Sequence, residues 1–305
     1  MEKLPNFLVV GFPKCGSTSL HYYLDAHPEI FMPKQKELHY FSNDVISKLN
    51  KGPKDKYIKK LHVQNSEDYK AQFVKAQNNQ AVGEISPSYI NYPEECIPKI
   101  KDLLGQPKII IVLRDPIKRA YSNYLHLLRE NRETLSFYNA LLKEEGRKKA
   151  SFSDFWYYAF NSDYYNKVKA YVSAFDDVLI LESELLKKNT QHEVARVYNF
   201  LEVSSKFKSD NLQKTYNEGG VYEQNLVTKF FFEQSKVRDV ARKIVPASTK
   251  MKHLKQKLVK RYKKETPEID KKAEEYLVNL LRKETKRLKD EFKLTCLGWT
   301  PELFN

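Results

Sequence analysis

Short apolar runs alternate with amphipathic stretches along most of the chain. The apolar runs predict strands near residues 7–11, 81–84, 109–113 and 178–181. Apolar positions three or four apart predict helices near residues 17–26, 66–77, 93–104, 116–130, 162–175 and 189–201. Strands that alternate with helices in this way predict an α/β fold, in which a central, mainly parallel sheet carries helices on both faces.

The length of 305 residues is enough to bury a large core, and we expect one domain over residues 1–305. The composition shifts near residue 236. Residues 236–293 hold 20 Lys or Arg against 9 Asp or Glu, which accounts for most of the net charge of +14. We interpret this segment as a basic, helical part of the same domain. Its charge would attract an acidic acceptor, an anionic lipid or a charged donor. Alternatively, the segment is only the solvated face of helices.

A glycine loop links the first predicted strand to the first helix. It begins at Gly11 and reads Gly-Phe-Pro-Lys-Cys-Gly-Ser-Thr-Ser. A strand, such a loop and a helix N-terminus make an anion site, because free backbone N–H groups and the positive end of the helix dipole converge there. Gly11 and Gly16 have the spacing of the nucleotide triphosphatase loop, but Ser17 replaces its lysine, and the loop's lysine is Lys14. We therefore expect a phosphate-bearing donor other than a nucleoside triphosphate.

A second strand-to-helix junction follows the apolar run 109–113. Asp115 can cap the next helix, Pro116 fits its first turn, and Ser122 lies two turns further along. Arg114 is a candidate phosphate ligand, because a guanidinium donates two parallel charge-assisted hydrogen bonds. Taken alone, Arg114 could equally pair with a surface carboxylate, and Asp115 could be a magnesium ligand.

Together, the two junctions resemble the donor-binding motifs of sulfotransferases that use 3′-phosphoadenylyl sulfate (PAPS). In that family the first loop binds the 5′-phosphosulfate, and the arginine and serine of the second hold the 3′-phosphate. The resemblance implies transfer of a sulfuryl group from PAPS to a hydroxyl or amine of a small-molecule or saccharide acceptor. The product would be 3′,5′-adenosine diphosphate (PAP), and no metal ion is expected. The residues that it assigns to the donor are Lys14, Cys15, Gly16, Ser17, Thr18, Ser19, Arg114 and Ser122.

The stretch that begins at Lys36 reads Lys-Glu-Leu-His-Tyr-Phe and resembles a segment of heparan-type carbohydrate sulfotransferases. The resemblance implies that Glu37 is the catalytic base, with His39 as the alternative, and that Lys14 stabilises the leaving group. In an extended stretch, Glu37 and His39 would lie on one side and Leu38 on the other. Without a site, Glu37 would be a solvated charge and His39 a buried, hydrogen-bonded histidine.

Weaker similarities extend along the chain. The segment 82–89 resembles a Gly-Glu-Lys-Ser-Pro segment of the same relatives, which makes Glu84 and Ser86 candidate substrate contacts. Ile85 replaces a lysine that several relatives carry there, and this weakens the case for a polyanionic sugar. Looser matches cover residues 216–221 and 276–299.

Several classes of protein are not expected. Cys15, Cys96 and Cys296 are too few and too widely separated for a disulfide framework or a zinc site. Nucleic-acid binding is not expected because the aromatic residues fall in core-like stripes. No apolar run approaches 18 residues and the first strand begins at once, so we expect a cytoplasmic protein without a membrane span. Nothing in the sequence indicates an oligomeric state.

Two other functions fit part of the pattern. A P-loop nucleotide kinase or NTPase is opposed by the missing Gly-Lys pair. A catalytically inactive, sulfotransferase-like binding protein is opposed by the intact set Lys14, Glu37, Arg114 and Ser122. The acceptor stays open among sugars, lipids, polyketides, phenols and amines. The aromatic stretch 155–160 predicts either helix core or a wall on which an aromatic or sugar ring would stack.

Overall fold

A computed structural model of the chain describes residues 3–58, 62–209, 212, 221–223 and 261–305. At its centre lies a five-stranded sheet in the order β2-β3-β1-β4-β5, and every neighbouring pair is parallel. The predicted α/β fold is confirmed. The strands of the sheet are β1 (Phe7–Gly11), β2 (Ile30–Phe31), β3 (Ala81–Ile85), β4 (Lys108–Leu113) and β5 (Val178–Glu182). A separate antiparallel pair consists of β6 (Val221–Tyr222) and β7 (Lys263–Lys264).

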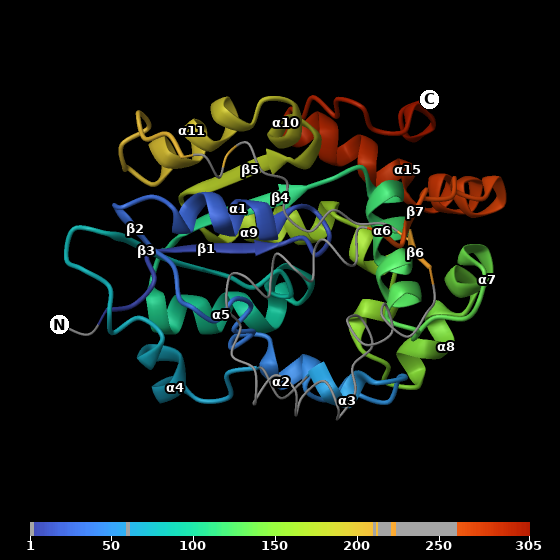
Figure 1. Cartoon of the computed structure of the whole chain (residues 1–305), viewed down its shortest axis with the longest axis horizontal. Coiled ribbons are helices and arrows are strands. Elements are labelled where there is room, and N and C mark those ends of the chain that lie inside the picture. The colour runs from blue at the N-terminus through green and yellow to red at the C-terminus, as the bar shows by residue number, and fades with distance from the viewer. Residues whose placement is uncertain (1–2, 59–61, 210–211, 213–220, 224–260) are drawn as a thin grey trace.

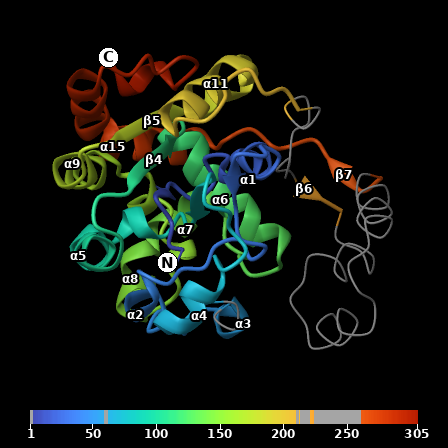
Figure 2. The same ribbon diagram turned by 90° about the vertical axis from the view of Figure 1, so that its left-hand side faces the viewer.

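Helices cover both faces of the sheet (Figure 1). In the turned view, α5 and α9 lie on one side of the strands and α1 and α11 on the other (Figure 2). The helices that flank the sheet are α1 (Ser17–Asp25), α5 (Pro93–Leu104), α6 (Pro116–Arg129), α9 (Tyr165–Ala174), α10 (Ser183–Lys188), α11 (Thr190–Phe200) and α15 (Lys271–Phe292). Shorter helices are α2 (Asn43–Ile46), α3 (Asp55–Ile58), α4 (Ser66–Ala71), α7 (Phe137–Leu142) and α8 (Glu144–Lys149).

The two central strands explain why their sequences read as continuous apolar runs. Every residue of β1 is buried, and so is every residue of β4 after Lys108. A parallel strand with helices on both faces has no solvent side, so neither face can carry polar side chains. The arrows of the sheet run in one direction and end facing α6 (Figure 1). The loops after β1 and β4 therefore meet at this carboxyl edge, where ligands bind in open α/β sheets.

The aromatic stretch 155–160 is not a helix core. It contributes to two short 3₁₀ turns, Asp154–Trp156 and Phe160–Ser162. Glu144 accepts hydrogen bonds from two consecutive backbone N–H groups at 2.8 and 2.9 Å, and Asp55 accepts one at 2.7 Å from the residue before the first turn. These carboxylates replace the bonds that a regular helix would have made. The aromatic side chains buried here are Trp156, Tyr157 and Tyr158.

The C-terminal segment is tied to the carboxyl edge of the sheet. Asp115 accepts hydrogen bonds from the backbone N–H and hydroxyl of Thr300 at 2.7 and 2.8 Å. Glu182, at the end of β5, accepts one from the N–H of Cys296 at 2.7 Å. Trp299 is buried beside them, where the looser C-terminal match expected a tryptophan. The match at 216–221 falls almost entirely outside the described residues, as does the basic stretch 236–260.

Candidate active site

The turn after β1 has the geometry of an anion cradle. A Cβ at Gly11 would lie 2.2 Å from the side chain of Ile90, so only glycine fits where the turn starts. Lys14 and Gly16 have positive φ angles of 69° and 103°, which reverses the chain before α1 begins at Ser17. Backbone N–H groups in such a turn and at a helix N-terminus face a common point and bind anions. The loop is thus shaped as the sequence predicted.

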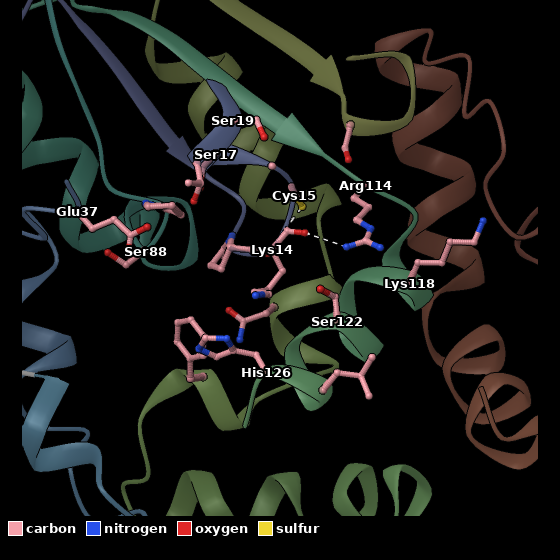
Figure 3. A pocket seen from close by; sticks show the side chains of 18 of the residues that line it. Lys14, Cys15, Ser17, Ser19, Glu37, Ser88, Arg114, Lys118, Ser122 and His126 are labelled. Carbon is pink, nitrogen blue, oxygen red and sulfur yellow. Dashed lines mark hydrogen bonds between the residues drawn. The ribbon is translucent and has the colours of Figure 1, made fainter. Parts of the chain in front are cut away.

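The junction between β4 and α6 places a second cation beside this turn. Asp115 caps α6, accepting hydrogen bonds from two first-turn N–H groups at 2.9 and 3.1 Å, as predicted. This cap leaves Arg114 at the strand end, where its Nη1 donates to the carbonyl of Lys14 at 3.2 Å (Figure 3). The Nε of Arg114 is buried and has no hydrogen-bond partner among the described residues. A buried donor of this kind suits an anionic ligand.

Both junctions open into one cavity of about 1020 Å³. The structure brings to its wall every residue that the sequence assigned to the donor or to the chemistry: Lys14, Cys15, Gly16, Ser17, Thr18, Ser19, Glu37, His39, Arg114 and Ser122. Figure 3 shows Arg114 and Ser122 to one side of Lys14, and Glu37 and Ser88 to the other. Arg114 and Ser122 on the one hand and the acid–base candidate Glu37 on the other therefore lie on different sides of Lys14.

Left-handed backbone at two positions directs Glu37 and His39 into the cavity. Their φ angles are 63° and 56°. The N–H of Glu37 donates to the carbonyl of Ile85 at 3.1 Å, and the N–H of His39 donates to the Ser86 hydroxyl at 3.0 Å. These bonds fasten the stretch across the end of β3. The stretch is therefore not extended, and Leu38 between the two residues is fully buried.

The Glu37 carboxylate is held in its ionised form. Burial would raise its pKa, but the Lys36 ammonium and the neighbouring His39 outweigh burial and hold the pKa of Glu37 well below its ordinary value. The Nε2 atom of His39 lies 3.7 Å from Glu37 Oε2, and its Nδ1 is hydrogen-bonded to the Ser88 hydroxyl at 2.7 Å. Glu37 is therefore unprotonated but a weak base, and His39 beside it is the second candidate for accepting a proton from a group that enters the cavity.

The Lys14 ammonium lies in an unfavourable environment. Burial first, and then the positive charges of Arg129 and Arg114, lower the pKa of Lys14 to about 7. The cavity therefore concentrates positive charge at the point where the turn exposes its N–H groups. A bound anion would offset these positive charges and raise the pKa of Lys14.

Glu84 and Ser86 lie outside the cavity wall. The Glu84 carboxylate is fully buried and accepts hydrogen bonds from Tyr89 at 2.7 Å, Tyr69 at 3.1 Å and Ser86 at 2.8 Å. Both side chains are buried, and the hydrogen bonds of Glu84 join it to tyrosines of the core. Ser86 connects this buried carboxylate to the backbone of His39.

Sequence reasoning missed His126, which lies on α6 one turn after Ser122. The Nη2 of Arg129 and the Nδ1 of His126 are hydrogen-bonded at 2.7 Å. Burial, with the charges of Lys14 and Arg129, holds the pKa of His126 well below its usual value. The signal that could have found it is the i,i+4 spacing from Ser122, which places both on one helix face. Phe155, from the aromatic stretch that the sequence offered as a possible wall, also lines the cavity; lining residues that the sequence did not single out are Ser88, Lys118, Asp154 and Lys187.

Comparison with known proteins identifies the family. The sequence profile of the sulfotransferase domain matches residues 4–288. The chain belongs to the sulfotransferase family. Its fold is similar to that of a solved sulfotransferase from Alicyclobacillus acidocaldarius, which is 35% identical, with a TM-score of 0.66 over 70% of this chain and 87% of that one. The family that the two junctions predicted is thus confirmed.

Curated relatives of this sulfotransferase match over a shorter region. The membrane-associated sulfotransferase kil1 of Dictyostelium discoideum is 35% identical over 121 residues, which are 40% of this chain and 22% of that protein. Human carbohydrate sulfotransferase 15 is 30% identical over 164 residues, which are 44% of this chain and 29% of that protein. The matched region covers less than a third of either relative.

Two further properties concern only the described part of the sulfotransferase. Within it, His, Cys, Asp and Glu side chains do not gather in a group of three that could hold a metal ion. In the same residues, no helix combines the length and the apolar content needed to cross a bilayer.

Proposed function

We propose that this sulfotransferase transfers the sulfuryl group of PAPS to a hydroxyl or amine of a small-molecule or saccharide acceptor. The observation that carries the proposal is the pairing of two anion sites in one cavity. The turn at residues 14–19 suits a 5′-phosphosulfate, while Arg114 and Ser122 suit a 3′-phosphate. A nucleotide with phosphate on both sides of its ribose matches two such sites. A nucleoside triphosphate carries its phosphates in a single row and leaves the second site unused.

Different residues of the cavity serve different parts of the transfer reaction. The acceptor O–H or N–H attacks sulfur while the bond from sulfur to the bridging phosphate oxygen breaks. The acceptor proton passes to the Glu37 carboxylate, or to His39, which lies 3.7 Å from it. Negative charge grows on the departing phosphate oxygen, and Lys14 together with the N–H groups of the turn stabilises it. The products are a sulfated acceptor and PAP.

Arg114→Lys is expected to weaken PAP binding about 10- to 100-fold and to leave the affinity for 5′-ADP nearly unchanged. A lysine keeps the charge but loses the paired donors that match a phosphate. Titration calorimetry with both nucleotides measures the difference, and Ser122→Ala should give a smaller effect in the same direction. An equal loss for PAP and 5′-ADP would contradict the assignment of Arg114 to the 3′-phosphate.

PAP binding is expected to take up a proton above neutral pH. In the free protein the pKa of Lys14 is about 7, and a bound anion would raise it. At pH 8 the uptake should approach about 0.9 proton per PAP, so affinity falls as pH rises above 7. Calorimetry in buffers of different ionisation enthalpy measures this uptake, with Lys14→Ala as the control. The same uptake in the alanine variant would contradict this origin.

Transfer of ³⁵S from labelled PAPS to a panel of sugars, phenols and amines tests the proposed activity. We expect labelled product from at least one acceptor class, with PAP released in equal amount. Release of phosphate from ATP, without sulfuryl transfer, would support the nucleotide kinase or NTPase alternative instead.

A further inference from the structure

The segment from Ser153 to Asn161 forms a wall of the cavity that donor binding does not use. Ser153, Asp154, Phe155 and Asn161 line the cavity there. Asp154 is partly accessible as a residue and lies on the cavity wall. Phe155, the next residue, is also partly accessible and lines the same cavity with an aromatic side chain. A carboxyl beside an aromatic ring is a combination that suits a molecule with both hydroxyl groups and an apolar face.

The position of Asp154 is fixed by a chain of hydrogen bonds that leads from the cavity wall into the buried interior. The Tyr92 hydroxyl donates to Asp154 Oδ2 at 3.2 Å, and the Asn161 side chain donates to the Asp154 carbonyl at 2.6 Å. Asn91 donates to the Asn161 side-chain oxygen at 2.6 Å, and Lys167 donates to Asn91 at 3.1 Å. Side chains in such a network are held in one geometry before any ligand arrives. The carboxyl is therefore preorganised.

The charges around this wall disfavour an acidic ligand. Burial raises the pKa of Asp154, and the charged groups that oppose this most are His39 and Lys167. Since His39 also lies 3.7 Å from Glu37, this part of the cavity holds two carboxyl groups around one histidine. An acid group brought between them would face like charge from the ionised Glu37 carboxylate.

In the described part of the chain, the other side of Phe155 faces the imidazole of His126. The ring of His126 lies 5.4 Å from that of Phe155, and its pKa is held well below the usual value by burial and by Lys14 and Arg129. His126 is thus neutral at pH 7. Arg129 is hydrogen-bonded to the Nδ1 of His126 and lies close enough to Lys14 to lower its pKa. Arg129 of α6 therefore places its positive charge near Lys14, in the turn after β1.

We propose that Asp154 and Phe155 recognise an uncharged sugar ring of the acceptor. Phe155 stacks on the apolar face of the ring, and Asp154 hydrogen-bonds a hydroxyl near the one that is sulfated. The same carboxyl excludes sugars that carry an acid group at that place. This inference rests on the proposed function, since it assigns the acceptor of that reaction.

Paired acceptors that differ only at C6 test this assignment. We compare 4-nitrophenyl β-glucoside and β-galactoside with the corresponding uronides and measure PAP release from PAPS. The wild-type enzyme should prefer the neutral sugars by at least about 10-fold in kcat/KM. Asp154→Asn should lower kcat/KM for the neutral sugars about 10- to 100-fold and bring their ratio to the uronides close to one. PAP affinity, measured separately, should not change.

Two further variants distinguish residues that contact the sugar from residues that only hold Asp154 in place. Tyr92→Phe removes the hydrogen bond to Asp154 but keeps its carboxyl, and the preference for neutral sugars should persist. Phe155→Ala should weaken both members of each pair equally. The proposal is overturned if Asp154→Asn slows neutral and acidic sugars alike, if the wild type prefers uronides, or if no sugar is sulfated. Failure of PAP binding in the wild type would instead refute the proposed function.

Discussion

Lys14→Ala should lower kcat about 100- to 1000-fold while the protein stays folded. Loss of one donor that stabilises charge in the transition state has an effect of this size. PAP affinity should fall less, because the N–H groups of the turn and Arg114 remain. The variant should unfold at no lower temperature than the wild type, since it removes a buried positive charge that lies close to Arg129 and Arg114. Steady-state kinetics, PAP titration and thermal unfolding measure the three quantities.

A matched control for this variant is Lys149→Ala. Lys149 is exposed at the end of α8 and does not line the cavity. Its replacement should leave kcat unchanged. Near-normal turnover by Lys14→Ala would contradict the role of Lys14 in stabilising the leaving group.

Glu37→Gln should lower kcat about 100- to 10,000-fold with little change in PAP affinity. Glutamine keeps the shape of the side chain but accepts no proton, and general base catalysis contributes a factor of this size. PAP affinity should persist because Glu37 lies across Lys14 from Arg114 (Figure 3). Single-turnover rates with saturating PAPS give the chemical step directly.

Two comparisons sharpen this result. Glu94→Gln, at an exposed position of α5, should behave as the wild type. His39→Asn should lower the rate less than Glu37→Gln if Glu37 is the base, because His39 then only orients the carboxylate. The reverse order would identify His39 as the proton acceptor and contradict the assignment to Glu37.

The sequence was most informative where the local pattern and the tertiary environment agree. β1 and β4 are buried on both faces, and their apolar runs identified them almost to the residue. Asp115 caps α6 and Pro116 lies in its first turn because cap chemistry is local. The strand β2 was missed because two residues carry no periodic signal.

The cavity was predicted only in part, because several of its residues are placed by distant contacts. Glu37 and His39 reach the cavity through left-handed backbone conformations and hydrogen bonds to the end of β3. The alternation of side chains in a strand does not predict such a conformation. The burial of Glu84 was not predicted, because a carboxylate in a strand gives no sign that two tyrosines and a serine will satisfy it. Asp154 lies in a turn shaped by Asp55, which is far from it along the chain. The positions of such side chains are set by tertiary contacts, which a local sequence pattern does not contain.

Equilibrium binding of PAP and ATP to the wild-type protein, with and without Mg²⁺, tests the central claim most directly. That claim is that the turn and Arg114 together form a site for a nucleotide phosphorylated on both sides of its ribose. We expect micromolar binding of PAP, at least about 10-fold tighter than ATP, and no requirement for Mg²⁺. Binding of Mg²⁺–ATP as tight as that of PAP, or no binding of PAP, would contradict it.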